Sequence, residues 1–183
     1  MIKEKVRLLP FHTSDPSFDA VVRLFSDSFF DRHYTDRDLQ EAKENILKHS
    51  KRPGFRGFTA FNSQGDVIGF IYGYASLPGQ FYHSQLKKAL DPEAGEEWLT
   101  NSFELVELAV DKQFRRRGVG SHLHDALLGR LPCEKAILTV GKGNETARQF
   151  YLNKGWEILS SEAIVIPGIE PQTIMVKRLK DPL

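Results

Sequence analysis

One segment of this 183-residue chain constrains the fold more than any other, and it runs from Phe103 to Leu131. Its first part, Phe103 to Val110, is an almost unbroken apolar run, which is typical of a strand buried on both faces. After a polar break, apolar residues recur at helical spacing, at Val119, Leu123, Leu127 and Leu131. The segment therefore predicts the order strand, loop, helix.

The loop between that strand and that helix has the composition of an anion-binding turn. Arg115, Arg116 and Arg117 come directly before Gly118, and Gly120 follows. The first amides of a helix lack partners inside the helix, and the helix dipole places about half a positive charge there. Glycines let a ligand approach the backbone, and arginines add permanent charge with planar donors. We therefore predict a site for a pyrophosphate or for several phosphates.

Two common phosphate-binding motifs do not fit this turn. The chain contains no Gly-x-x-x-x-Gly-Lys-Ser/Thr string, which excludes a Walker A loop. The dinucleotide-binding fingerprint needs a third Gly or Ala three residues after Gly120, and that position is Leu123. What remains is the pattern Arg-x-x-Gly-x-Gly, from Arg115 to Gly120, directly after a strand.

A second motif lies downstream, from Asn144 to Trp156, and reads N-x-x-A-x-x-F-Y-x-x-x-G-W. A strand-like run, Lys135 to Val140, separates the two motifs. In this order and spacing the chain resembles the GCN5-related N-acetyltransferases, the GNAT superfamily, whose first motif holds the pyrophosphate of coenzyme A. The resemblance covers residues 66 to 160 well and the rest of the chain in outline.

The resemblance implies an α/β (α+β) GNAT fold, with a mixed, mostly antiparallel sheet of about seven strands, helices on both faces, and splayed fourth and fifth strands. Sequence patterns predict a helix over 18–29 with Asp15 as its N-cap, and a helix over 36–49 introduced by a near capping box at Thr35 and Asp38. Further strands are predicted over 5–9, 55–61, 67–75, 135–140, 156–166 and 172–179, and a further helix over 144–153.

We expect one domain over residues 1–183, because a chain of this length can bury a sizeable core. Residues 78–100 form an insertion between the third and fourth strands, with helical spacing from Phe81 to Leu90 and another turn after Asp91-Pro92. Two interpretations of this insertion stay open, a substrate lid and a packing appendage.

The resemblance also implies acetyl-CoA as co-substrate. In the family, backbone groups of the fourth strand hold the pantetheine arm, and one amide there supplies the oxyanion donor. Carried onto this chain, the coenzyme-binding positions are Leu108, Ala109, Val110, Arg115, Arg116, Arg117, Gly118, Val119, Gly120, Ser121, Asn144, Ala147, Phe150 and Tyr151.

Tyr151 matches the family tyrosine that faces the departing sulfur. A phenol with a pKa near 10 gives its proton to a thiolate near 8.5 only uphill, by about 2 kcal/mol. A hydrogen bond that stabilises the thiolate is therefore easier to defend than complete proton transfer. The structural alternative is a core tyrosine beside Phe150.

An amine acceptor also needs a base, since deprotonating an alkylamine at neutral pH costs about 4 to 5 kcal/mol. Glu107 alternates with Phe103, Leu105 and Ala109 in the apolar strand, where a carboxylate is costly unless it is paired or used. Glu104 points the other way and is the second candidate. The alternative for both is an ion pair with an arginine or a backbone contact.

We therefore expect an enzyme, an N-acetyltransferase that transfers acetyl directly to the primary amine of a small molecule, because the aromatic-rich insertion would close over a peptide groove. The alternatives are a protein or peptide amine acetyltransferase and a non-catalytic acyl-CoA-binding module. An acidic and aromatic set falls where the family places part of its acceptor site and either attracts a cation or forms a solvated helix face. Its members are Asp27, Phe29, Phe30, Asp31, Tyr34, Asp36, Asp38 and Glu41.

Other features narrow the partners. A net charge of +1 gives no general attraction to nucleic acid. A single cysteine, Cys133, excludes an internal disulfide, and His122 and His124 point in different directions on a helix, so we expect no metal. No apolar run approaches the roughly 20 residues of a membrane helix. We expect a cytoplasmic protein, and a homodimer by analogy with the superfamily.

Overall fold

A computed structural model describes residues 5–30 and 33–179. Over these residues the elements are β1 (Arg7–Pro10), α1 (Phe18–Phe29), α2 (Asp36–Ser50), β2 (Arg56–Phe61), β3 (Val67–Ser76), α3 (Phe81–Ala89), α4 (Pro92–Leu99), β4 (Ser102–Val110), the 3-10 turn η1 (Lys112–Phe114), α5 (Val119–Leu128), β5 (Lys135–Gly141), α6 (Glu145–Asn153), β6 (Glu157–Ala163) and β7 (Gln172–Arg178).

The strand order is β1-β2-β3-β4-β5-β7-β6. Strands β4 and β5 are parallel, whereas β1 with β2, β2 with β3, β5 with β7 and β6 with β7 are antiparallel. The predicted seven-stranded mixed sheet is confirmed.

The chain divides into two compact units, which are described separately. Unit 1 comprises Met1–Tyr74 and Val106–Arg130, and unit 2 comprises Ala75–Leu105 and Leu131–Leu183. Strand β4 contributes its first half to unit 2 and its second half to unit 1. A single domain over residues 1–183 stays a prediction.

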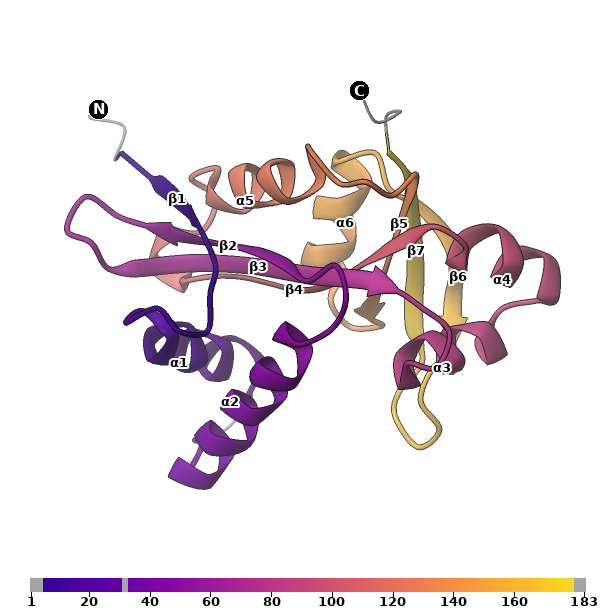
Figure 1. The fold of residues 1–183 in the computed structure, drawn as a ribbon, viewed down its shortest axis with the longest axis horizontal. Helices are drawn as coiled ribbons and strands as arrows, with labels where there is room; N and C mark the ends of the chain where they lie inside the picture. The colour runs from indigo at the N-terminus through magenta and orange to yellow at the C-terminus, as the bar shows by residue number, and fades with distance from the viewer. Residues whose placement is uncertain (1–4, 31–32, 180–183) are drawn as a thin grey trace. The chain divides into compact units, whose positions relative to one another are not determined.

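In unit 1, helices pack on both faces of the strands. Successive side chains of β3 point to opposite faces, and each face meets different helices. Phe70 and Tyr72 join the apolar residues of α1 and α2 in one buried cluster. Gly69 faces the other way, and a Cβ there would lie 3.0 Å from a methyl group of Leu123 on α5. Figure 1 shows α1 and α2 on one side of β2 and β3 and α5 on the other. The close approach of α5 explains why glycine occupies position 69.

The starts of α1 and α2 test two sequence predictions. Asp15 is not the N-cap of α1, because that position is Ser17, and the Asp15 carboxylate instead accepts the amide of His12 at 3.2 Å. The carboxylate therefore stabilises the preceding turn. The capping box of α2 is confirmed, since the Asp38 amide donates to Thr35 Oγ1 and the Thr35 amide donates to Asp38 Oδ2.

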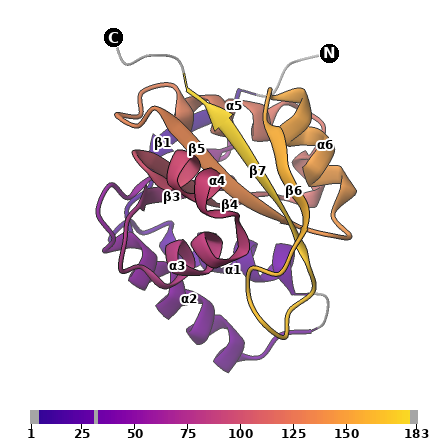
Figure 2. The same cartoon turned by 90° about the vertical axis from the view of Figure 1, so that its right-hand side faces the viewer.

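In unit 2, β7 lies between β5 and β6, as Figure 2 shows. The insertion forms α3 and α4, as its spacing predicts, and α4 is capped by Asp91, which accepts the amide of Ala94 at 2.9 Å. Leu86, Trp98 and Leu99 from these helices are buried with Ile137 and other sheet residues. The insertion is thus part of the core of unit 2, and a lid role stays a prediction.

Strand β4 changes character along its length. Its residues from Ser102 to Leu105 are buried, while Val106 to Leu108 are half-buried, so the prediction of burial on both faces is correct only for the first half. In the described chain the parallel register pairs Ser102–Glu104 with Lys135–Ile137 and extends no further. Because β4 continues to Val110 and β5 continues to Gly141, the predicted splay of these strands is confirmed.

Candidate active site

The start of α5 in unit 1 has the geometry of an anion-binding turn. Its N-cap, Gly118, has a φ of 86°, which is left-handed, and no side chain caps the helix. A Cβ at this position would meet nothing within 4 Å, so backbone conformation rather than crowding requires the glycine. The amides of the first turn, at Val119, Gly120 and Ser121, therefore have no side-chain cap.

The three arginines before α5 do different things. The Nε atom of Arg115 donates to the carbonyl of Val110 at 3.0 Å and braces the end of β4. The guanidinium of Arg117 lies over the ring of Phe114, 5.4 Å from its centroid. Arg116 has a φ of 57°, a strained conformation for a residue with a Cβ. Charge is therefore concentrated at this turn, but part of the Arg115 side chain serves the fold.

A hollow of about 710 Å³ in unit 1 lies next to this turn. Its lining residues come from the end of α1, the chain before α2, and the turn after β4, and they are Asp27, Ser28, Phe30, His33, Tyr34, Lys112 and Arg115. The Tyr34 hydroxyl donates to Asp27, which holds the two together. The hollow thus combines one acidic group, aromatic rings and two cations.

The predicted acidic and aromatic set is divided by the structure. Asp27, Phe30 and Tyr34 line the hollow. Asp38 caps α2 and Glu41 pairs with Arg37, while Phe29 contacts Phe25 with ring centroids 4.9 Å apart. Asp36 is in the first turn of α2, and Asp31 lies outside the described residues. A solvated helix face is thus correct for the members on α2.

The two candidate bases lie in different units. Glu107 is in unit 1 and half-buried, and burial raises its pKa from the ordinary 4.5 to about 8. Glu104 is in unit 2 and only 3% exposed. The raised pKa of Glu107 reflects burial and lies near the range in which a general base works, while its role as the base stays a prediction.

Tyr151 lies on α6 in unit 2 and is 7% exposed. Its ring contacts Phe150 and Trp156 edge-on, with centroids 5.2 and 5.7 Å away. Asn144 caps α6, because its side chain accepts the amide of Ala147 at 3.1 Å. Packing accounts for the position of Tyr151, and its role at the sulfur stays a prediction, as do the coenzyme contacts of Asn144, Ala147 and Phe150.

Sequence reasoning missed a polar pair in unit 1. Nδ1 of His49 lies 3.0 Å from the hydroxyl oxygen of Tyr72, which is fully buried. The available signal was a polar atom at a core position, since Tyr72 alternates with Phe70 on β3 and His49 lies one helical turn after the buried Ile46. Burial lowers the pKa of His49 to about 4 and raises the pKa of Tyr72.

The remaining candidates carry little chemistry. His124 is buried with Nδ1 2.9 Å from Asp125 Oδ1, whereas His122 is exposed. Cys133 is buried, and burial raises the pKa of its thiol. Among residues 5–30 and 33–179, no three His, Cys, Asp or Glu side chains are grouped to hold a metal ion. Within the same residues, no helix has the length and apolarity needed to cross a membrane.

Comparisons with known proteins agree with this geometry. A sequence model described as the acetyltransferase (GNAT) family matches residues 18–156. No curated protein sequence matches the chain significantly.

Among solved structures, the fold is similar to that of a putative acetyltransferase from Acinetobacter baylyi ADP1, with a TM-score of 0.69 and 14% identity over 98% of this chain and 96% of that one. It is also similar to Ard1 from Thermoplasma volcanium, with a TM-score of 0.67 and 20% identity over 96% and 99%. The ribosomal-protein-S18-alanine N-acetyltransferase from Escherichia coli matches with a TM-score of 0.66 and 14% identity over 96% and 94%. At these identities the likeness concerns the fold.

Proposed function

This chain belongs to the acetyltransferase (GNAT) family, and from that premise we propose that it transfers an acetyl group directly from acetyl-CoA to the primary amine of a small molecule. The family and its structural neighbours make it an acyltransferase.

The single observation that carries the proposal is the start of α5. Gly118 turns the chain left-handed, no side chain caps the first turn, and three arginines precede it. Uncapped amides at a helix N-terminus bind anions, and arginine adds charge-assisted donors. A diphosphate matches this set, and coenzyme A carries one. We assign the diphosphate to the backbone from Gly118 to Ser121, with Arg116 and Arg117 as the charged contacts.

The second half of β4 supplies backbone for the rest of the donor. The register with β5 ends at Glu104, so the following residues of β4 are not paired with β5 in the described chain. The carbonyl of Val110 accepts from Arg115, and the amides of Leu108 and Val110, which alternate with those that face β3, are the candidates for the pantetheine arm and the oxyanion. Their backbone rather than their side chains would do this work.

Glu107 is the proposed base. A carboxylate with a pKa of about 8 takes a proton from an alkylammonium near 10.4 at a cost of about 3 kcal/mol, against 4 to 5 for release to neutral water. The neutral amine then attacks the thioester carbon, an amide of β4 stabilises the oxyanion, and the thiolate leaves. A hydrogen bond from Tyr151 would stabilise that thiolate.

The pH dependence of kcat/KM tests this assignment. We expect kcat/KM to rise with pH through about 8, because only the ionised Glu107 accepts a proton. Glu107→Gln should lose that limb and at least about 100-fold in kcat/KM. Glu104→Gln is the matched control on the same strand and should keep the limb. If Glu107→Gln left the pH dependence of kcat/KM unchanged, Glu107 would not be the base.

One observation supports a small amine as acceptor. The hollow combines Asp27 with the rings of Phe30 and Tyr34, groups that attract an organic cation, beside the side chains of Lys112 and Arg115. Release of free thiol from acetyl-CoA should therefore depend on small amines in a mixed panel. Turnover of peptides alone would favour a protein acceptor, and no thiol release with any amine would favour a non-catalytic acyl-CoA-binding module.

A further inference from the structure

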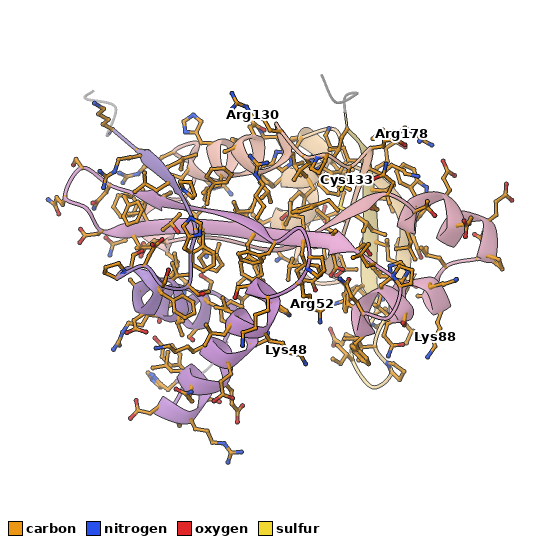
Figure 3. All side chains as sticks on the ribbon, viewed as in Figure 1. Lys48, Arg52, Lys88, Arg130, Cys133 and Arg178 are labelled. Carbon is orange, nitrogen blue, oxygen red and sulfur yellow. The ribbon has the colours of Figure 1, made fainter. Side chains whose placement is uncertain are left out.

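A partly buried hydrogen bond in unit 1 joins α2 to β3 through two side chains to which the proposed function assigns no role. Nδ1 of His49 lies 3.0 Å from the Tyr72 hydroxyl oxygen. The His49 ring also contacts the rings of Tyr72 and Tyr74, with centroids 5.8 and 5.6 Å away. Figure 3 labels Lys48 and Arg52, which flank His49 in the sequence near the C-terminal end of α2. Because Tyr72 is fully buried, its hydroxyl depends on a partner within the protein.

Tyr72 lies level with Glu107 along the sheet. The amide of Asp111 donates to the carbonyl of Ile68 at 2.9 Å, and a Cβ on Gly69 would lie 3.1 Å from the carbonyl of Ala109. Moving forward along β3 therefore means moving backward along β4, so the two strands are antiparallel. Continuing by four residues on each strand from the first of these contacts brings Tyr72 opposite Glu107. In agreement, the charge of Glu107 adds to burial in raising the pKa of Tyr72.

We assign the Tyr72 hydroxyl as the donor in its bond with His49, which places the ring proton of His49 on Nε2. A phenol, with an ordinary pKa near 10, is a stronger acid than the N–H of a neutral imidazole, and a neutral imidazole nitrogen is a stronger base than a phenol oxygen. Burial lowers the pKa of His49 to about 4, and the charges of Arg52 and Lys48 act in the same direction, so the ring is neutral at physiological pH. With the ring proton on Nε2, Nδ1 accepts and the proton of Tyr72 points toward α2.

We propose that His49 and Tyr72 are positioning residues for Glu107: by accepting the hydroxyl proton of Tyr72, His49 keeps that proton from the Glu107 carboxylate and so preserves a base strong enough to deprotonate an amine. A hydroxyl that donated to the carboxylate would stabilise its charged form and weaken it as a base. The titratable and charged groups around the pair are Tyr74 on β3 and Lys48 and Arg52 next to His49. The inference rests on the proposed role of Glu107.

The test measures the pKa of the Glu107 carboxyl directly, by carbon-13 NMR titration of the full chain, with the resonance assigned from Glu107→Gln. His49→Phe removes the acceptor but keeps a ring against Tyr72 and Tyr74. His49→Asn keeps an acceptor oxygen near the position of Nδ1 and is the matched control. Tyr72→Phe removes the hydroxyl, alone and combined with His49→Phe.

We expect His49→Phe to lower the pKa of Glu107 by about one unit, because the released hydroxyl turns to the carboxylate. His49→Asn should stay near the wild-type value, and the shift should vanish in the double variant. The inference would be overturned if His49→Phe left the pKa of Glu107 unchanged. It would also be overturned if that pKa still shifted in the double variant, which lacks the Tyr72 hydroxyl. If His49→Phe does not fold, His49→Leu replaces it with the same expectations.

The two proposals fail in different ways. The acid limb of kcat/KM should move with the carboxyl pKa in His49→Phe. If the pKa of Glu107 shifts but the acid limb of kcat/KM stays in place, Glu107 is not the base. If the pKa of Glu107 does not change in His49→Phe, only the His49–Tyr72 inference is overturned. The NMR titration measures this pKa whether or not Glu107 acts in catalysis.

Discussion

Helices α5 and α6 each begin after a strand, but they begin in opposite ways. The N-cap of α6 is Asn144, whose side chain accepts an amide of the first turn, and Glu145 adds a negative charge there. The N-cap of α5 is Gly118, which offers no side chain, and arginines rather than acids precede it. Both helices have the same dipole, so the difference lies in what neutralises it.

This difference separates two tasks. The chain itself satisfies the start of α6, which leaves that helix to hold a side chain, Tyr151, in a packed position. The start of α5 has no side-chain cap, and cations are placed where self-stabilisation would call for acids, so we propose it as the site for a ligand. We therefore expect changes at α6 to affect turnover or folding and changes at α5 to affect coenzyme affinity.

The largest expected effect is on α6. Tyr151→Phe should lower kcat by about 100-fold, because the departing thiolate loses a hydrogen bond. Coenzyme affinity measured by calorimetry should change little, and so should thermal unfolding, since the ring keeps its contacts with Phe150 and Trp156. An unchanged kcat would leave Tyr151 as a core residue only.

The next effect is on α5. Arg117→Glu should weaken binding of coenzyme A by about 10- to 30-fold, because a charge-assisted contact is replaced by repulsion of the diphosphate. Arg148→Glu is the matched control, since Arg148 is in the first turns of α6 and pairs with Glu145. Equal losses of affinity in both variants would break the comparison, because a general charge effect would then explain them.

The smallest effect tests the cap of α6. Asn144→Ala should lower the free energy of unfolding by about 1 kcal/mol, and Asn144→Asp, which keeps an acceptor for the Ala147 amide, should not. If the Asn144 amide group also contacts coenzyme A, both variants lose a few-fold in affinity. Chemical denaturation and calorimetry separate the two roles. Loss of stability in Asn144→Asp would contradict the capping role.

Much of the fold follows from local patterns in the sequence. The capping box of α2, the loop between β2 and β3, and the left-handed exit at Gly155 all depend on residues within a few positions of one another. Asp15 shows the limit of such reasoning. Its carboxylate can stabilise either the helix that follows or the turn that precedes, and the turn takes it. The sequence pattern alone does not choose between these two.

The candidate site was less predictable because its contacts are non-local. Glu107 could be identified from one carboxyl in an apolar strand, and its raised pKa follows from that burial. The bond between His49 and Tyr72 joins residues 23 positions apart, and no spacing rule links them. The brace from Arg115 to Val110 was likewise hidden, because a run of three arginines reads as uniform charge.

The burial of Glu107 also makes the fold sensitive to acidity. The carboxyl ionises near its ordinary value of 4.5 when the chain is unfolded and near 8 when it is folded. Between these two pKa values Glu107 is protonated in the folded chain and ionised in the unfolded chain. The contribution of Glu107 to the free energy of unfolding therefore falls as pH rises, by on the order of 3 kcal/mol once partial exposure is allowed for. This contribution of Glu107 to stability is fully present below pH 4.5 and is lost above pH 8. Glu107 therefore costs the fold stability as pH rises toward 8, whereas the lowered pKa of His49 costs it stability as pH falls from 6.5 toward 4, so the two groups limit the stable range from opposite sides.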